Sequence, residues 1–481
     1  MAARLVEELA ALAAAPPVAL GPSDRGLIAR VARLANDPRT STAAIHAGVL
    51  QAFARLGTAF PVEAVEGVYH FTSDRPMSSA FAAAGGADVA LVALERVCVP
   101  DVAPATFDTV VKAFSQYTSW TPSLNTAAVL ARVAALCEAR RASSSGKELA
   151  ALCRAACVMV CQAPELVDAS QLCAARLPQV ALDLLQLALK SRVAASEDDA
   201  FLAFCTLSPC ISRASSGSDV ARLVASGLIP ALMASWQRFG ANEEIATNAP
   251  GIVGLVIEAS RRDLVPAETE RIRRATIEAG FIKEAAASLL RSMRARTVAT
   301  ILGALNECVR DSDEAKAAAH ESGVIKSVVS AVRGALAGGA GRSARHSQKV
   351  NFDALVVVNG TQLCKTFCSG GSGAAARQDA FVIAGGVEVL DATLASPLAA
   401  TDASLRETVL HAKELVSSVT SSTGRGTLVW GTLPCSNPGC ERPMTSRCSR
   451  CAVPYCSPDC QRAHWPKHKA ECKARAAALV R

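Results

Sequence analysis

Apolar residues recur at intervals of three and four along the first 420 or so residues of the chain. The spacing is clear in "SGLIPALMASWQRF" (226–239), "TVATILGALNECV" (297–309) and "LRETVLHAKELVSSV" (405–419). Such intervals place apolar side chains on one face of an α-helix. The alternating pattern of half-buried strands bounded by hairpin turns is missing. The sequence therefore predicts an all-α fold for this region.

One short element recurs within the helical text: a turn of small residues ending in glycine, an aliphatic pair, and then an apolar helix. A glycine suits this position because a helix that ends before a reversal of the chain needs a left-handed or sterically bare backbone. The step between the fourth and fifth copies is close to the ~40 to 47 residues of HEAT and armadillo units. The element occurs at Gly48, Gly86, Gly227, Gly280, Gly323 and Gly386.

Residues 302–333, "LGALNECVRDSDEAKAAAHESGVIKSVVSAVR", resemble an armadillo repeat, and the resemblance extends more loosely over about 40–420. It implies an α-solenoid in which an asparagine of each long third helix lies in the concave groove and binds the backbone of a ligand. Asn306 and Asn359 match that position. The alternative is an ordinary surface or helix-capping role, which is common for asparagine.

Changes in composition divide the chain. The stretches 333–348 and 368–377 are rich in small residues and read as flexible loops between helices, and 419–434 shifts to Gly, Ser and Thr. We predict the domains 1–420 (helical repeats), 421–434 (linker), 435–472 (a cysteine-rich module) and 473–481 (a basic C-terminal tail).

Cysteine is distributed very unevenly: 7 of the 18 cysteines lie within 435–472 of the 481-residue chain. The other eleven, such as Cys137 and Cys308, lie in apolar helical text, which is typical of buried free thiols in a reducing compartment. A disulfide knot needs the opposite environment, so metal is the better account of the cluster. No apolar run reaches the ~20 residues of a membrane span, and the start lacks a secretory pattern. We expect a soluble protein, cytoplasmic and/or nuclear.

The cluster falls into four short pairs, and structural zinc takes four ligands in tetrahedral geometry. Two zinc ions therefore use the set with none left over. His468 and Cys472 share one face of a helical turn, whereas His464 lies eight residues from Cys472 and Pro466 predicts a fresh helix start after Trp465. We therefore exclude His464. The eight predicted ligands are Cys435, Cys440, Cys448, Cys451, Cys456, Cys460, His468 and Cys472.

The texts "RCSRC" (447–451) and "YCSPDCQRAHWPKHKAEC" (455–472) resemble a MYND-type zinc finger. The resemblance implies cross-braced ligation, with Cys435, Cys440, Cys456 and Cys460 on one zinc and Cys448, Cys451, His468 and Cys472 on the other. It also implies that the finger binds partner proteins, often through Pro-rich peptides, at positions matching Gln461, Trp465 and, more weakly, Ser449. Packing in the small core of the finger is the alternative for Trp465.

Charge is concentrated in the tail of the chain. Nine Lys and Arg against three Asp and Glu from Cys435 to Arg481 give +6 of the net +7, and two zinc ions bound by seven thiolates lower that to about +3. This modest balance argues against nucleic acid as a partner.

Both zinc sites are filled by protein ligands, so no catalytic position remains, and we predict a non-enzymatic adaptor with no catalytic residues. The alternatives are a MYND-containing protein lysine methyltransferase, a ubiquitin ligase, and a nuclear transcriptional corepressor-like factor.

Overall fold

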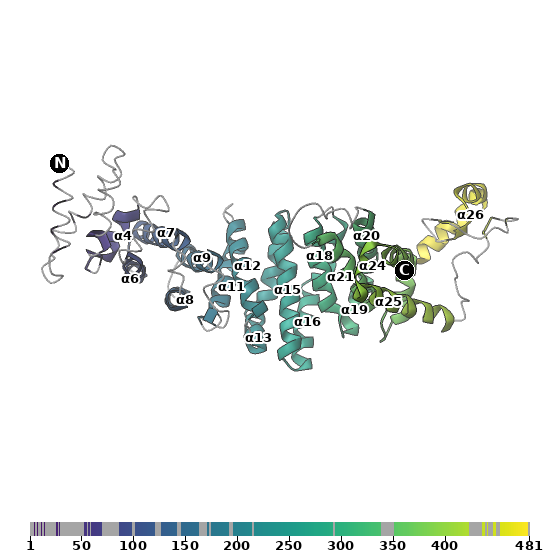
Figure 1. Ribbon diagram of the computed structural model, residues 1–481, viewed down its shortest axis with the longest axis horizontal. Coiled ribbons are helices and arrows are strands. Elements are labelled where there is room, and N and C mark those ends of the chain that lie inside the picture. The colour runs from purple at the N-terminus through teal and green to yellow at the C-terminus, as the bar shows by residue number, and fades with distance from the viewer. Residues whose placement is uncertain are drawn as a thin grey trace. The chain divides into compact units, whose positions relative to one another are not determined.

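The computed structural model shows a chain built almost entirely of helices, the last of which is α26, Pro458–Leu479 (Figure 1). Among the described residues, no helix combines the length and the apolar character needed to cross a membrane. The structure describes residues 4, 7, 11, 14, 26, 28, 52–54, 56–57, 59–69, 86–98, 102–120, 127–141, 146–162, 171–172, 175–191, 196–213, 216–291, 294–337, 351–422, 435–437, 440, 446–448 and 453–479.

The chain forms two compact units, 1–281 and 282–481. This division falls inside the predicted repeat domain, at the start of helix α17 (Phe281–Leu290). The predicted boundaries near 420, 434 and 472 stay predictions. The first unit contains α4 (Pro61–Tyr69), α6 (Ala87–Val97), α7 (Pro104–Trp120), α8 (Ala127–Arg141), α9 (Gly146–Gln162), α11 (Leu177–Lys190), α12 (Ser196–Arg213), α13 (Gly217–Ala225), α14 (Leu228–Phe239), α15 (Glu243–Asp263) and α16 (Pro266–Glu278).

The second unit holds the remaining helices and, in its described part, two very short strands. The helices before the cysteine-rich module are α18 (Ala295–Val309), α19 (Asp313–Glu321), α20 (Val324–Ala337), α21 (Phe352–Cys368), α22 (Ala374–Ile383), α23 (Gly386–Leu394), α24 (Pro397–Thr401) and α25 (Ala403–Ser422). The module itself has β1 (Ser446–Arg447), β2 (Pro454–Tyr455) and α26 (Pro458–Leu479).

Repeats of three packed helices build both units. In the first unit α13, α14 and α15 contact one another, as do α22, α23 and α25 in the second. The long helices pack in series: α12 lies between α9 and α15, and α21 lies between α18 and α25. Fully buried aliphatic side chains such as Leu207 of α12 and Val256 of α15 line these faces. The predicted all-α solenoid is confirmed, with strands described only in the module.

Glycine marks the turn between the first two helices of a repeat. Gly227, Gly280 and Gly323 have φ angles of +91°, +85° and +71°, the left-handed region that other residues adopt at a cost. The last copy differs from the prediction by one residue. Gly385 takes the left-handed conformation (φ +80°), while a Cβ on Gly386 would lie 2.3 Å from the Phe381 ring.

The two earlier copies of the element do not extend this pattern. Gly86 has a right-handed φ of −65°, so it does not serve as a left-handed turn. Gly48 lies outside the described residues.

Asn306 and Asn359 join two long helices instead of presenting an open row of amides. The Thr366 hydroxyl of α21 donates to Oδ1 of Asn306 on α18 at 3.0 Å, and Asn306 is only 7% exposed. Nδ2 of Asn359 on α21 donates to the carbonyl of Ala299 on α18 at 2.9 Å. These bonds fit neither predicted role, which was binding of a ligand in the groove or capping of a helix end. The asparagines instead bond across the contact between α18 and α21, because the two helices pack closely there.

The sequence predicted a flexible loop over 368–377, and the structure has a loop at 369–373 between α21 and α22, while residues from 374 on belong to α22. Arg377 is 1% exposed, and its guanidinium donates to four carbonyls at the end of α21 and in the loop. The four acceptors are Phe367 O (2.9 Å), Ser369 O (3.3 Å), Gly370 O (3.1 Å) and Ser372 O (2.6 Å). The other predicted loop, 333–348, includes the last turn of α20, and its residues from 338 on lie outside the described part.

Replacement of Arg377 by methionine tests this arrangement. Methionine keeps an unbranched apolar stem but leaves the loop carbonyls without their buried donor, and such a loss costs about 2 to 4 kcal/mol. Hydrogen exchange of the amides from 369 to 378 in the full-length protein should accelerate accordingly. Arg406→Met is the control, because Arg406 also donates to two carbonyls but is exposed. Equal acceleration in both variants would contradict the assigned role.

Candidate metal centre and partner groove

The cysteine-rich module is a minimal hairpin followed by a helix. β1 and β2 pair antiparallel with Ser446 opposite Tyr455. The amide of Cys448 donates to the carbonyl of Val453 at 2.9 Å, which closes the turn. The hairpin thus places Cys448 directly after β1 and Cys456 directly after β2, while α26 carries the ligands from Cys460 onward.

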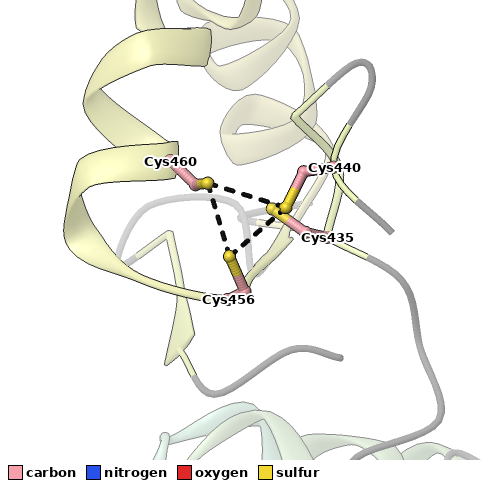
Figure 2. A group of neighbouring side chains, drawn as sticks. All are labelled: Cys435, Cys440, Cys456 and Cys460. Carbon is pink, nitrogen blue, oxygen red and sulfur yellow. Dashed lines mark hydrogen bonds between the residues drawn. The ribbon is translucent and has the colours of Figure 1, made fainter. Parts of the chain in front are cut away.

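Four thiols from three separate segments meet at the first group. The Sγ atoms of Cys435, Cys440, Cys456 and Cys460 all lie within 4.8 Å of one another. Figure 2 shows them turned toward a common point, with Cys460 coming from the start of α26. The separations are 3.5 Å for Cys440–Cys456, 3.3 Å for Cys456–Cys460 and 3.8 Å for Cys460–Cys440.

The second group joins the hairpin to the middle of α26. Cys448, His468 and Cys472 offer ligand atoms within 4.8 Å of one another, and all three residues are buried. The Sγ atoms of Cys448 and Cys472 are 3.7 Å apart. Cys451, the predicted fourth ligand, lies outside the described residues.

These distances fit zinc. A tetrahedral ion with Zn–S bonds of about 2.3 Å separates its sulfurs by about 3.8 Å, and the observed separations lie between 3.3 and 3.8 Å. Thiolate and imidazole are the donors that zinc prefers, and hard cations such as magnesium and calcium prefer oxygen. The module thus binds two structural zinc ions in the cross-braced pattern.

Metal binding competes with protons at the first group. Without the ion, burial and hydrogen bonds with the thiols of Cys460, Cys440 and Cys435 raise the pKa of Cys456 to about 12, while the hydrogen bond from Cys456 lowers the pKa of Cys460. The Cys456 thiol is therefore protonated at neutral pH until zinc displaces the proton. The affinity for zinc consequently increases with pH.

Cysteines of the helical region are a different kind of thiol. Cys157 and Cys364 are buried among apolar side chains, and burial raises the pKa of both well above the ordinary value. Thiols of this kind stay protonated and unreactive near neutral pH. Among the described cysteines none is in a disulfide.

Tyr455 organises the inside of the module, a role that the sequence analysis missed. The side chain is fully buried, and its hydroxyl lies 3.0 Å from Nδ1 of His464. Its ring meets the His468 ring edge-on at 6.0 Å. The two ligand groups described above do not include His464, whose ring links α26 to β2 through Tyr455. The apolar residues Val453 and Pro454 just before Tyr455 could have indicated that this aromatic side chain is buried.

The prediction of a new helix after Trp465 is wrong. α26 runs without interruption from Pro458 to Leu479, with Pro466 inside it. A proline in this position removes one backbone hydrogen bond and crowds the preceding turn. Cys460, before the proline, and His468, after it, lie on this one helix and belong to the two different ligand groups.

A shallow apolar groove opens on the outer face of α26. It is lined by Pro458, Gln461, Arg462 and Trp465, which are spaced as one face of a helix. Trp465 is half-buried and packs against the thiol-rich core, as the packing alternative has it, and its contact with a partner stays a prediction. The sequence analysis did not predict that Pro458 and Arg462 line this groove. Their positions seven and three residues before Trp465, on the same face of a helix, could have indicated it. Ser449 lies outside the described residues.

Comparison with known protein families and with solved structures agrees with this geometry. Residues 435–472 match the family model of the MYND finger. An engineered protein, 17% identical, aligns over 85% of this chain and 94% of its own length with a TM-score of 0.51. A structure concerning a phosphorylation switch in the interaction between cadherin and beta-catenin is 13% identical. The alignment covers 90% of this chain and 73% of that structure's chain, with a TM-score of 0.62. No curated protein matches the chain in sequence.

The fold and the site together define a two-module protein: an all-α repeat solenoid with a cross-braced zinc module. Residues 435–472 are a MYND finger, and the helical region has the armadillo-type fold.

Cys448→Ser tests the second ligand group. Serine does not supply a soft thiolate, so native mass spectrometry of the full-length protein should show fewer than two zinc ions. Since a structural site contributes about 10 to 16 kcal/mol in zinc-finger peptides, the finger should unfold while the circular dichroism of the solenoid persists. Cys98→Ser, a half-buried cysteine outside both groups, should retain two zinc ions. Two ions bound to Cys448→Ser would contradict the assignment.

Proposed function

We propose that the protein is a non-catalytic adaptor that recognises short Pro-rich segments of partner proteins through the groove on α26. MYND fingers and armadillo-type repeats are both modules of protein–protein interaction. The observation that carries the proposal is the exposed groove in which Gln461 and Trp465 lie beside Pro458.

The chemistry of the groove suits an extended, Pro-rich segment. Trp465 offers a large flat apolar surface, and Gln461 offers an amide that can donate to and accept from a peptide backbone. A Pro-rich segment is extended before it binds, so it loses little conformational entropy on docking. Zinc supports this recognition indirectly, because its ligands hold the helix that bears the groove.

The solenoid supplies a second interaction surface in this proposal. An armadillo-type array exposes an extended surface along its long helices. Asn306 and Asn359 are bonded between α18 and α21, so recognition by a ladder of asparagines is not part of the proposal. We place the protein in the cytoplasm and/or the nucleus.

An enzymatic role is the rival hypothesis. The predicted ligand sets leave neither zinc an open position for a catalytic water. A lysine methyltransferase would insert its finger in a strand-rich catalytic domain, whereas strands are described here only in the finger. A ubiquitin ligase with a RING finger carries its histidine nearer the middle of the ligand order, and here it is the seventh of eight. Absence of ubiquitin discharge from a charged conjugating enzyme would close that option.

Trp465→Ala separates recognition from folding. Loss of an aromatic anchor typically weakens binding by about 2 kcal/mol, or roughly 30-fold. Partners captured from a native lysate on the full-length wild-type protein should disappear with the variant, and those partners should share a Pro-rich segment.

Two further measurements make the comparison decisive. Trp465 also packs against the core of the finger, so the zinc content of Trp465→Ala is measured as well. A content of two zinc ions shows that the variant finger is still folded. Phe352→Ala removes another partly exposed aromatic, outside the finger, and should leave the captured set unchanged. A captured set that is the same for wild type and Trp465→Ala would exclude the groove as the binding site.

A further inference from the structure

The face of α26 that carries the groove continues past Trp465 to a cation. Residues of an α-helix are separated by about 100° around the axis. Lys469 therefore lies about 40° from Trp465 and one turn further along the helix, next to the end of the groove. Lys469 is exposed.

Lys469 lacks the usual means of neutralisation on a helix. Side chains three and four positions apart are neighbours on a helix surface, and an acidic residue there would pair with the lysine. None of these positions is acidic: they hold Trp465, Pro466, Cys472 and Lys473.

Arg462 adds a second positive charge at the groove. Its side chain is 80% exposed and pairs with Asp459, which is 82% exposed, at 2.5 Å. A surface pair of this kind contributes little free energy, so a ligand carboxylate can compete for the guanidinium at small cost.

The zinc centres do not cancel this charge. With their thiolates the two sites carry about −2 and −1, counting Cys451 as a ligand. Cys448, Cys472 and His468 of the second group are between 1% and 4% exposed, whereas Cys440 and Cys456 of the first group are partly exposed. Together the two sites lower the charge of residues 435–481 from +6 to about +3, so it stays positive. The outer face of α26 thus presents an apolar groove bordered by exposed positive groups.

We propose that the preferred partner segment combines an apolar, Pro-rich core with an acidic residue placed to meet Lys469. The inference rests on the proposed function, since it names the chemistry of the segment that the same groove binds. Four residues of helix separate Trp465 from Lys469 by about 6 Å, and an extended peptide advances about 3.3 Å per residue. The acidic residue therefore lies about two to four positions beyond the apolar anchor, allowing for the flexible stem of lysine.

The experiment uses zinc-loaded full-length protein and an array of 12-residue synthetic peptides, each with fixed proline and otherwise random sequence. Peptides that bind wild type but not Trp465→Ala define the groove ligands. Each ligand is then remade with Glu replaced by Gln and Asp by Asn. Groove ligands should be enriched in acidic residues at the stated spacing, and the amide versions should bind about 1.5- to 5-fold more weakly.

A pair of charge reversals locates the effect. Lys469→Glu should remove or invert the preference for the acidic peptides. Lys467→Glu makes the same change of charge on an exposed residue about 160° around the helix from Lys469, and it should retain the preference.

The outcomes distinguish the inference from the proposed function. Groove ligands with no preference for acidic residues, or equal effects of Lys469→Glu and Lys467→Glu, would overturn the inference and leave the groove as a Pro-rich site. If no peptide depends on Trp465, both the inference and the proposed function fall.

Discussion

Tetrahedral coordination by thiolates is the constraint on which the finger depends. The buried core of the described part is made of its own ligand cysteines together with Val453 and Tyr455, so there is little apolar area to stabilise it. Each ligand group instead draws on segments far apart in sequence: the first joins Cys435 and Cys440 to the start of α26, and the second joins Cys448 to its middle. Two ions thereby determine how the hairpin and the helix pack together.

The same residue type serves two kinds of chemistry in this chain because its surroundings differ. In the solenoid, thiols such as Cys157 and Cys364 occupy small apolar spaces between helices, where burial favours the neutral form. In the finger, three or four ligands converge within 4.8 Å, and the charge of a metal ion stabilises the thiolates together. Spacing alone does not separate the two kinds, because Cys153, Cys157 and Cys161 of α9 also lie four residues apart. The finger differs in that its ligands come together from separate segments of the chain.

Prediction from sequence succeeded for helices and ligand pairs and failed for individual side-chain contacts and for one proline. Helical periodicity and ligand pairs are local, and both led to the observed elements and groups. Arg377 was assigned to a flexible loop, yet its guanidinium donates to carbonyls from Phe367 to Ser372. Asn359 bonds to a carbonyl 60 residues away, and Pro466 stays helical between two zinc ligands. Local helix and loop propensities do not predict these features.

One helix carries both the metal ligands and the recognition face, and this arrangement couples them. Cys460, His468 and Cys472 bind zinc from α26, while Pro458, Gln461 and Trp465 form the proposed binding surface on the same helix. A partner that binds only the ordered helix stabilises the metal-bound state, and the metal in turn raises the affinity for the partner, because linked equilibria are reciprocal. In the proposed function, zinc therefore acts on recognition without contacting the partner.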